Sequence, residues 1–371
     1  MRIMIDATPL LLRSAGVKGH IYYWLEALRR LAGHQMIRAF PFIQRTAGLD
    51  HERSIFSPWT TYPRLAALYG VNWLGSPALD LCLKGCDVFH ASNQVRHPPR
   101  KAKLTATIFD LTTTKLPEMH TAANVQADAW FAERILKKAD GLIAISESTR
   151  QDAIELLGIP EEKIETVPCG VSEAYFHVPV ADVLEVKELY QLSKPYALSV
   201  GTVEPRKNLD RLLDAWLGLE PDLRQHHELV LAGPPGWKSE NTLRRIAGAP
   251  EGVRYLGYVP EQFLPALTAG AVLLAYPSLY EGFGLPLAQA MAAGVATITS
   301  NVSSMPEVAG DGAVLVDPFS VTEIRTALTR LLENPTLRER LAARGRERAQ
   351  NYRWQRVARR SLLFFERIAG S

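Results

Sequence analysis

The stretch AVLLAYPSLYEGFGLPLAQAMAAGVATITS, Ala271–Ser300, holds two short apolar runs with a helical pattern between them. The first run, AVLLAYPS, and the last, VATITS, have the length of buried strands, whereas LPLAQAMAAG is helical in pattern and ends at Gly294. A glycine suits the end of a helix. A strand, a helix and a second strand in this order predict a βαβ unit with parallel strands.

The same alternation runs through the rest of the chain. Further apolar runs are YALSVG, ELVLAG and VRYLG in the second half, and RIMID, DVFHAS, LTATIFD and GLIAIS in the first half. Apolar strands separated by helices predict parallel sheets that are covered on both faces. The strands are too many for one sheet, and residues 176–193 contain no buried strand. The chain is therefore predicted to be α/β, with two doubly wound, Rossmann-like domains.

The predicted domains are residues 1–178 and 179–355, followed by an amphipathic, basic tail, 356–371. The tail is expected to form a last helix that packs back on the first domain. Ligands of doubly wound sheets bind at the carboxyl ends of the strands. The two sheets are therefore expected to face each other across a cleft that holds the site.

Composition excludes several classes of protein. Of the 371 residues, 47% are hydrophobic and 22% are charged, as in ordinary globular proteins, and a net charge of +3 does not indicate a nucleic-acid partner. Three cysteines give no disulfide framework, which fits a reducing compartment. The run MRIMIDATPLL is wrongly flanked for a signal peptide, and no run reaches the roughly 20 apolar residues of a membrane helix. A cytoplasmic protein is expected.

Two stretches of the first domain each allow two interpretations. A basic cluster consists of Arg96, His97, Arg100, Lys101 and Lys103. A solvated loop is favoured there, and the alternative is a surface for an anionic membrane or a phosphorylated acceptor. Residues 62–85 mix aromatic, apolar and basic side chains. Core helices are favoured over a surface that contacts the inner membrane peripherally.

The loop after YALSVG carries two adjacent cations. The sequence SVGTVEPRKNLDRLLDAW ends a strand at Gly201, places Arg206 and Lys207 in the loop and offers Asn208 as the cap of the helix LDRLLDAW. Cations beside a helix N-terminus make an anion site, because the first helical amides add about half a positive charge. A diphosphate is the natural ligand. The alternative is two solvated loop cations.

The loop LYEGFG has the same position relative to its own helix. Gly282 and Gly284 permit a tight turn or a positive φ, and Pro286 suits a first helical turn. Glu281 is therefore expected to point into the cleft. There it either caps the helix or binds sugar hydroxyls, since a carboxylate would repel a diphosphate. The polar residue eight positions on, Gln289, is neutral.

Two further residues are weaker candidates. Gly16 and Gly19 precede an amphipathic helix in SAGVKGHIYYWLEALRRL, and this loop could approach a phosphate from the first domain. Asp110 ends the strand TATIFD, where active-site side chains of such sheets gather. Alternatively, Asp110 caps or hydrogen-bonds the TTT loop that follows. The chain has no Asp-x-Asp signature, so neither a metal ion nor a cofactor is expected.

Together these segments resemble a known family. EPRKNLDRLLDAW, LAGPPGW, VRYLGYVPEQFLPAL and PSLYEGFGLPLAQAMAAGVATITSNVSSMPEVAGDGAVLVDP, with the N-terminal glycine loop, are similar to the retaining glycosyltransferases of family GT4, or group 1, which have the GT-B fold. The similarity is strong over residues 196–318 and weak over residues 35–85. It implies a variable first domain for the acceptor and a second domain for the nucleotide-sugar donor.

The resemblance also assigns residues. Arg206 and Lys207 match the pair that clamps the donor diphosphate, and Glu281 matches the first carboxylate of a Glu-x7-Glu signature, which binds donor-sugar hydroxyls. The signature ends here in Gln289, and Phe109 stands where the family often has histidine. The implied catalytic residues are Arg206, Lys207, Glu281 and Asp110, and the implied donor-binding residues are Gly16, Gly201, Tyr258, Gly282, Phe283, Gly284, Leu285 and Gln289.

The implied activity is that of a metal-independent hexosyltransferase that retains the anomeric configuration. Its donor is a UDP- or GDP-linked sugar, and its acceptor is a hydroxyl of a saccharide or a polyprenyl-linked saccharide in bacterial cell-surface polysaccharide synthesis. In the family's front-face mechanism the departing phosphate oxygen takes the acceptor proton, so no protein base is needed. The alternatives are an epimerase or phosphorylase of the same fold, and a non-catalytic protein that binds nucleotide or glycan.

Overall fold

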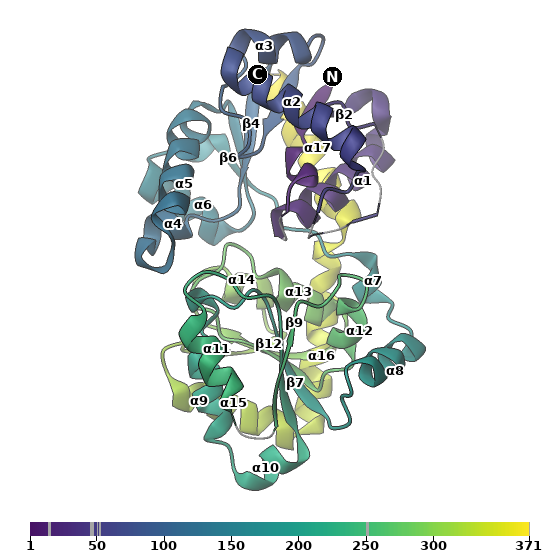
Figure 1. The fold of residues 1–371 in the computed structure, drawn as a ribbon, viewed down its shortest axis with the longest axis vertical. Helices are drawn as coiled ribbons and strands as arrows, with labels where there is room; N and C mark the ends of the chain where they lie inside the picture. The colour runs from purple at the N-terminus through teal and green to yellow at the C-terminus, as the bar shows by residue number, and fades with distance from the viewer. Residues whose placement is uncertain (14–15, 45–47, 50, 52, 250–251, 371) are drawn as a thin grey trace. The chain divides into compact units, whose positions relative to one another are not determined.

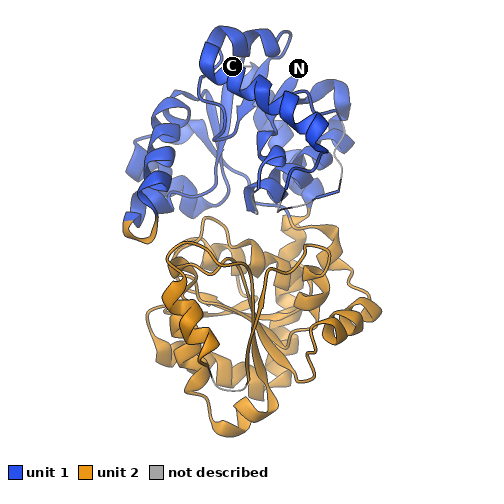
Figure 2. Ribbon diagram, viewed as in Figure 1, with its two compact units in different colours: residues 1–117, 121–170, 354–371 blue, residues 118–120, 171–353 orange. Residues whose placement is uncertain are grey.

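The chain forms two compact units, each built around its own parallel sheet (Figure 1). The structure is a computed structural model, and it describes residues 1–13, 16–44, 48–49, 51, 53–249 and 252–370. Unit 1 comprises residues 1–117, 121–170 and 354–371, and unit 2 comprises residues 118–120 and 171–353 (Figure 2). The predicted α/β class with two doubly wound sheets is confirmed.

Unit 1 contains a six-stranded parallel sheet in the order β2-β1-β3-β4-β5-β6. Its strands are β1 Ile3–Asp6, β2 Ile37–Phe40, β3 Val88–Ala91, β4 Lys103–Ile108, β5 Gly141–Ala144 and β6 Ile164–Thr166. Every residue of β1, β3 and β5 is buried, as expected for strands that helices cover on both faces. The strand order reverses between β1 and β3, so their carboxyl ends are the switch point of this sheet.

Helices connect these strands. They are α1 Gly16–Met36, α2 Pro58–Leu74, α3 Ser76–Cys82, α4 Thr112–Lys115, α5 Ala122–Arg134, α6 Glu147–Leu157 and α17 Trp354–Gly370, with 3-10 helices at Thr8–Leu11, Pro117–Met119, Leu136–Lys138 and Glu161–Lys163. The ends of α6 follow from its sequence. Oγ of Ser146 accepts from the backbone N of Thr149 at 3.0 Å, and Gly158 ends the helix in the left-handed conformation.

The last helix, α17, packs into the core of unit 1 beside α1. Nε1 of Trp24 in α1 donates to Oγ of Ser361 in α17 at 2.9 Å, and Phe364 is fully buried. A Cβ atom at Gly141 of β5 would lie 2.4 Å from Cδ1 of Ile368, so the sheet has a glycine where this helix approaches it. These contacts hold the tail of the chain in unit 1.

Unit 2 contains a second six-stranded parallel sheet, in the order β12-β11-β10-β7-β8-β9. Its strands are β7 Tyr196–Val200, β8 Glu228–Ala232, β9 Val253–Gly257, β10 Leu273–Tyr276, β11 Ala296–Ser300 and β12 Ala313–Val316. This is the order of a Rossmann sheet, because the chain runs outward from β7 to β9 and then returns to the centre at β10. Ligands of such sheets bind outside the carboxyl ends of the two central strands, here β7 and β10.

The helices of unit 2 cover both faces of its sheet (Figure 1). They are α7 Glu173–Phe176, α8 Val180–Leu189, α9 Leu209–Leu217, α10 Pro221–His226, α11 Glu240–Ala247, α12 Leu264–Ala269, α13 Leu285–Ala292, α14 Met305–Ala309, α15 Val321–Glu333 and α16 Pro335–Ala349, with 3-10 helices at Pro205–Lys207 and Gln350–Tyr352. In α9, Leu212, Leu213 and Trp216 are buried in the core. Their spacing is that of one apolar helix face.

The boundaries of the units differ from the expected ones by a few residues. The chain enters unit 2 at Val171, whereas the sequence analysis placed the change after residue 178. The short helix α7 belongs to unit 2, because it packs on α12 and α13 and the carbonyl O of Phe176 accepts from Nη2 of Arg346 at 2.9 Å. The return to unit 1 occurs at Trp354 instead of residue 356.

Core helices were favoured for residues 62–85, and α2 and α3 meet this expectation on one side only, where Leu68, Val71 and Leu79 join the core. Only one side of α2 is buried, through Thr61, Leu68 and Val71, and its tryptophans and tyrosines are exposed. Apolar content alone does not tell which side of a helix the rest of the chain covers. None of the described helices has the length and apolarity that crossing a membrane requires.

Candidate functional site

Two loops meet at the switch point of the unit 2 sheet. The first follows β7 and contains the 3-10 helix Pro205–Lys207, and the second follows β10 and leads into α13. The backbone N of Leu279 donates to the carbonyl O of Arg206 at 2.9 Å. Nη1 of Arg206 donates in turn to the carbonyl O of Tyr280 at 2.8 Å, across 74 positions of sequence. These bonds fix the two loops to each other.

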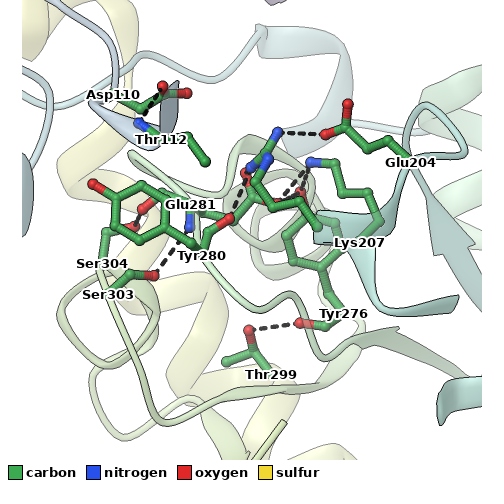
Figure 3. A network of polar contacts seen from close by, with 11 residues as sticks. Asp110, Thr112, Glu204, Lys207, Tyr276, Tyr280, Glu281, Thr299, Ser303 and Ser304 are labelled. Atoms are coloured by element: carbon green, nitrogen blue, oxygen red, sulfur yellow. Dashed lines mark hydrogen bonds and ion pairs between the residues drawn. The ribbon is translucent and has the colours of Figure 1, made fainter. Parts of the chain in front are cut away.

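Glu281 lies at this junction and binds both predicted cations, Arg206 and Lys207. Figure 3 labels Glu281 and Lys207. Its Oε2 is 2.5 Å from Nη1 of Arg206, and its Oε1 is 2.7 Å from Nζ of Lys207. The side chain of Glu281 is 8% exposed and each cation is 13% exposed, so solvent screens these pairs little. From the sequence, the carboxylate and the cations are expected to bind different parts of a ligand. The structure pairs them with each other.

A second carboxylate and a tyrosine complete the cluster. Oε1 of Glu204 accepts from Nη2 of Arg206 at 2.7 Å. The hydroxyl of Tyr276 accepts from Nζ of Lys207 and donates to Oε1 of Glu281, both at 2.7 Å. Two cations therefore face two carboxylates, and the four charges balance. Charges this deeply buried are tolerated only when each has a partner.

The contacts shift the protonation equilibria of the cluster. Burial alone would raise the pKa of Glu281, but the charges of Arg206 and Lys207 lower that pKa to about 2. Burial lowers the pKa of Lys207, and the neighbouring Arg206 adds to this effect. Burial and the charge of Glu281 both raise the pKa of Tyr276. Around neutral pH, Glu281 is therefore a carboxylate and Tyr276 is a neutral phenol.

The loop after β11 supports Glu281 through its backbone. Oγ of Ser303 accepts from the backbone N of Glu281 at 3.1 Å, and Oγ of Ser304 donates to the carbonyl O of Glu281 at 2.9 Å. Ser303 has a φ of 52°, a left-handed conformation that is costly for a residue other than glycine. Strained backbone next to a fixed charge cluster is typical of functional loops.

Helix α13 begins directly after the cluster, at Leu285. Gly284 precedes it with a φ of 86°, and a Cβ atom there would lie 2.2 Å from Cε of Met305, so this turn requires glycine. Within the described residues, the backbone N–H groups of Phe283, Gly284 and Leu285 have no hydrogen-bond acceptor. Such amides, with the helix dipole, favour an anion at the start of α13.

Gln289 lies one turn further along α13 and takes no part in the charge cluster. With Leu285 and Pro286 it forms the half-buried side of this helix. Its side-chain amide makes no hydrogen bond to any other residue that the structure describes. The second position of the signature is thus structurally independent of the first.

Asn208 corrects a second expectation, that its side chain would cap α9. It stands before α9 with a φ of 60°, but its Nδ2 donates to the carbonyl O of Pro277 at 2.9 Å and of Pro318 at 2.7 Å. The side chain therefore ties the β7 loop to the loops after β10 and β12. Local sequence could not show this, because the two acceptors are 69 and 110 positions away.

The other predicted residues of unit 2 lie along the carboxyl edge of its sheet. Gly201 follows β7, and a Cβ atom on Gly233, which follows β8, would lie 1.9 Å from the carbonyl O of Gly201. These two loops therefore pack backbone against backbone. Tyr258 follows the edge strand β9 and is 40% exposed. It is further from the switch point than Gly201, because β8 lies between β7 and β9.

Gly16 and Asp110 belong to unit 1. Gly16 is exposed at the start of α1, a Cβ atom there would meet no described atom within 4 Å, and residues 14–15 before it lie outside the described part of the chain. Asp110 is exposed, and its Oδ1 accepts from the backbone N of Thr112 at 3.1 Å, at the start of α4 (Figure 3). Asp110 therefore hydrogen-bonds the TTT loop, as the alternative interpretation expected, although Leu111 and not Asp110 is the N-cap residue of α4.

An imidazole packs against Phe109 from another element. The ring centroids of His20 in α1 and Phe109 are 5.1 Å apart in an edge-to-face arrangement. Trp24 and Trp354 contact the same imidazole at 5.7 and 5.3 Å. Burial lowers the pKa of His20 to about 3, so it is neutral at ordinary pH. His20 was not predicted as a site residue, because nothing local in the sequence connects it with Phe109.

Histidine, cysteine and acidic side chains can bind metal ions, and cysteine thiolates can act as nucleophiles. Among the described residues, no group of three or more His, Cys, Asp and Glu side chains is arranged to hold a metal ion. Cys82, Cys86 and Cys169 are free. Burial raises the pKa of Cys169 to about 12, so this thiol is not a nucleophile at neutral pH.

Comparisons with known proteins match both units. Residues 14–175 match the family model described as Glycosyltransferase Family 4, and residues 183–348 match the one described as Glycosyl transferases group 1. Over 271 residues the chain is 36% identical to the O-antigen chain mannosyltransferase B of Escherichia coli, covering 72% of this chain and 71% of that protein. The chain belongs to glycosyltransferase family 4. The resemblance noted in the sequence is confirmed.

Solved structures of other proteins share the fold of this family 4 glycosyltransferase. The sucrose-phosphate synthase of Thermosynechococcus elongatus has a TM-score of 0.74 and 21% identity, over 100% of both chains. HepE of Anabaena in complex with UDP has a TM-score of 0.69 and 15% identity, over 99% of this chain and 100% of that one. At these identities the likeness concerns the fold alone, and it confirms the predicted GT-B fold.

Four residues of the charge cluster and of the loop that supports it were not predicted from the sequence, namely Glu204, Tyr276, Ser303 and Ser304. Tyr276 carried a signal, because it ends a strand at the edge of the sheet where ligands bind. Glu204 precedes the cations by two positions and was recognisable as a counter-charge. The two serines gave no signal, since only the folded β11 loop brings them to Glu281.

Proposed function

We propose that this glycosyltransferase transfers mannose from a nucleotide-diphosphate sugar to a hydroxyl of a saccharide acceptor, with retention of the anomeric configuration. The sugar and an O-antigen-like chain as the acceptor follow from the name of the E. coli relative, an O-antigen chain mannosyltransferase. A lipid-linked acceptor is what the family resemblance implies. The cytoplasm is the proposed compartment, which suits three free thiols. The proposal includes no cofactor and no metal ion.

One observation carries the proposal, the buried cluster of Glu281, Arg206 and Lys207 at the carboxyl ends of β7 and β10. Two loops from the two central strands place an acid and two bases together there. This is where Rossmann sheets bind ligands. Buried charges are costly for folding, so a cluster at this position is better explained by ligand binding than by stability.

The donor diphosphate is proposed to bind at the start of α13. The backbone N–H groups of Phe283, Gly284 and Leu285 are available there, and the helix dipole favours negative charge. Lys207 has three N–H donors and uses two of them on Tyr276 and Glu281. The third donor suits a phosphate oxygen, as in the clamp that the family resemblance implies.

The charge balance of the cluster implies an exchange of partners when the donor binds. Glu281 pairs with both cations, and together with Glu204 it balances their charge. A donor brings phosphate anions and sugar hydroxyls into the same place. Arg206 and Lys207 then turn toward the phosphates and Glu281 toward the hydroxyls, so that every buried group keeps a partner. This exchange reconciles the observed pairing with the expected division of roles.

Catalysis is proposed to come from charge stabilisation on the leaving diphosphate. Cleavage of the bond between the sugar C1 and the phosphate oxygen builds negative charge on that oxygen, and the α13 amides and the cations that have turned toward the diphosphate stabilise this charge. The same oxygen accepts the proton of the acceptor hydroxyl, whose oxygen bonds to C1 from the side that the phosphate leaves. Configuration is retained and no protein base is required, which agrees with a neutral Gln289.

The test is a transfer assay with the purified chain. UDP-, GDP- and dTDP-linked mannose and glucose are offered with a synthetic polyprenyl-linked saccharide, and mass spectrometry detects the added hexose. The one-bond C–H coupling of the anomeric carbon reports retention, and chelation of divalent ions should leave the rate unchanged. Arg206→Ala and Lys207→Ala should each lower the rate by about 100-fold or more. Transfer at the wild-type rate in both variants would refute the proposal.

Arg245→Ala is the matched control for these variants. Arg245 also binds two carboxylates, Asp210 and Asp214, but on the partly exposed surface of α11. Its substitution should leave transfer unchanged, since it lies outside the proposed site. Loss of activity in this control as well would show that any broken ion pair in unit 2 is harmful.

A non-catalytic binding protein is the second candidate. Two departures from the family pattern favour this candidate. Gln289 stands where the family has a glutamate, and Phe109 stands where it often has a histidine. Such a protein would bind the nucleotide sugar, with a measurable Kd, and would show neither transfer nor donor hydrolysis. The assay above therefore separates the two candidates.

A further inference from the structure

Helix α2 presents a row of aromatic side chains to solvent. Trp59, Tyr62, Ala66, Tyr69 and Trp73, here called the α2 stripe, follow one another at intervals of three and four residues. Residues with this spacing lie on one side of a helix. The two tryptophans are 88% and 85% exposed, and the two tyrosines are 68% and 67% exposed. Among the described residues, no other tryptophan is as exposed.

The α2 stripe is not a core face that the chain covers elsewhere. The buried residues of α2, Thr61, Leu68 and Val71, lie on the other side of the helix. The stripe spans 14 helical steps, or about 21 Å. Leu81, 77% exposed on the adjoining helix α3, extends the apolar surface. Figure 1 shows α2 and α3 together on the outside of unit 1.

Basic residues are attached to the same two helices. Oδ1 of Asn72 in α2 accepts from the backbone N of Arg96 at 2.9 Å. Oδ1 of Asp80 in α3 accepts from the backbone N of Arg100, also at 2.9 Å. Lys101 follows directly, and the side chains of Arg96, Arg100 and Lys101 are exposed. The loop 96–101 is therefore fixed beside the C-terminal end of the α2 stripe.

Positive charge is concentrated in this part of the chain. Residues 58–103 contain six Lys and Arg and two Asp and Glu, an excess of four positive charges, whereas the whole chain has an excess of only three. The remaining residues, with 36 basic and 37 acidic side chains, are close to neutral. The aromatic row and the positive excess thus lie in the same segment of the chain.

We infer that the α2 stripe and the loop 96–101 form a docking surface for an anionic lipid bilayer. Tryptophan and tyrosine suit the boundary between headgroups and acyl chains, because each has an apolar ring and a polar N–H or O–H. Basic residues beside them meet the negative charge of the lipids. No described helix can cross a membrane, so α2 lies in the plane of the interface.

Charge favours a bilayer over a second copy of the chain. A symmetric dimer through the α2 stripe would place the same basic loop of each copy near the other. Like charges brought together across an interface oppose association. An anionic surface offers opposite charge to both features. The inference does not rest on the proposed sugar transfer, since binding to lipid requires neither donor nor acceptor.

The experiment is flotation of the purified full chain with vesicles. One set contains equal parts of phosphatidylcholine and phosphatidylglycerol, and the other contains phosphatidylcholine alone. The chain should float with the anionic vesicles and not with the neutral ones. Binding should weaken when the salt is raised from about 0.1 M to about 0.5 M, which shortens the screening length. Absence of binding, or equal binding to both sets, overturns the inference.

Two pairs of variants locate the surface. Trp59→Ser with Trp73→Ser should weaken binding at least about tenfold. Val180→Ser with Leu184→Ser, which removes two exposed apolar side chains from α8, is the control and should bind as the wild type does. Both original tryptophans are almost fully exposed, so the circular dichroism spectrum and melting temperature should not change. Wild-type binding by the tryptophan pair contradicts the inference.

The charge pair is tested in the same way. Arg96→Gln with Lys101→Gln should weaken binding about thirtyfold. Arg340→Gln with Arg359→Gln removes two exposed charges elsewhere and should have no effect. Sedimentation equilibrium without vesicles tests whether a second copy of the chain covers the α2 stripe instead. A dimer that Trp59→Ser with Trp73→Ser abolishes would show that a second copy covers the α2 stripe, and the bilayer inference would then be wrong.

Discussion

Oε2 of Glu281 lies 2.5 Å from Nη1 of Arg206, across 75 positions of sequence. Both side chains are almost fully removed from solvent. A buried charge that loses its partner is strongly unfavourable, whatever the pair itself contributes. The contact therefore makes the geometry of the loops after β7 and β10 depend on both groups being charged, and it links the stability of unit 2 to the proposed donor site.

Replacement of Glu281 by glutamine should destabilise the protein. Glu281→Gln keeps the shape of the side chain but removes the charge that Arg206 and Lys207 share. The expected loss in the free energy of unfolding is about 3 kcal/mol. Urea unfolding followed by tryptophan fluorescence measures it. Glu185→Gln, on the exposed side of α8, is the control and should change stability by less than about 0.5 kcal/mol.

The same carboxylate predicts a loss of stability in acid. The pKa of Glu281 is about 2 in the folded protein, against an ordinary value of 4.5. A group whose pKa is lowered by folding contributes stability that is present above its unfolded pKa and is lost as the pH falls toward the folded pKa. The stability difference between wild type and Glu281→Gln should therefore be constant above pH 4.5 and shrink from there toward pH 2.

Urea midpoints of the two proteins across this range provide the measurement. A stability difference that stays constant from about pH 6 to about pH 2.5 would mean that the pKa of Glu281 is not lowered by folding. The assignment of a carboxylate held by Arg206 and Lys207 would then be wrong.

The fold was largely predictable from the sequence, because its signals are local. The runs YALSVG, AVLLAYPS and VATITS are β7, β10 and β11, with one or two residues of difference at their ends. Apolar runs of this length between helical patterns leave few architectures other than a doubly wound sheet. The exposed side of α2 was not predictable in this way, since an aromatic row on a helix is also typical of a core.

The site was predictable only in part, because its decisive contacts are long-range. Arg206, Lys207 and Glu281 were correctly brought to one place by the rule that ligands bind at strand ends. Their mutual pairing was not foreseen, since it depends on the exact distance between two loops. The cap predicted for Asn208 failed for the same reason, because two distant carbonyl groups compete for its amide.

Gly284 should not tolerate a side chain. Gly284→Ala combines a φ of 86° with a Cβ position 2.2 Å from Met305, and both destabilise the turn before α13. Gly257→Ala is a matched control, because Gly257 has a φ of 65° but open space around the Cβ position. The control should cost about 1 kcal/mol for conformation alone, and Gly284→Ala should cost at least about 2 kcal/mol. Equal melting temperatures of the two variants would contradict the steric part of this argument.

Gln289 should accept a negative charge. Its amide has no hydrogen bond within the described residues and is half-buried, so Gln289→Glu neither breaks a contact nor buries a charge fully. We expect stability within about 0.5 kcal/mol of the wild type and transfer at a similar rate. Glu281→Ala, in contrast, should lose most of the turnover. If Gln289→Glu is folded but inactive, the neutral amide is required by the site and its proposed role needs revision.

The central claim is that the cluster of Glu281, Arg206 and Lys207 binds the donor, with the two cations on its diphosphate. Calorimetric titration of UDP and GDP into the wild type and into Lys207→Ala tests it most directly, with Arg245→Ala as the control. For the nucleotide that the wild type binds more tightly, Lys207→Ala should raise the Kd at least about tenfold, and Arg245→Ala should leave it unchanged. An unchanged Kd in folded Lys207→Ala would contradict the account.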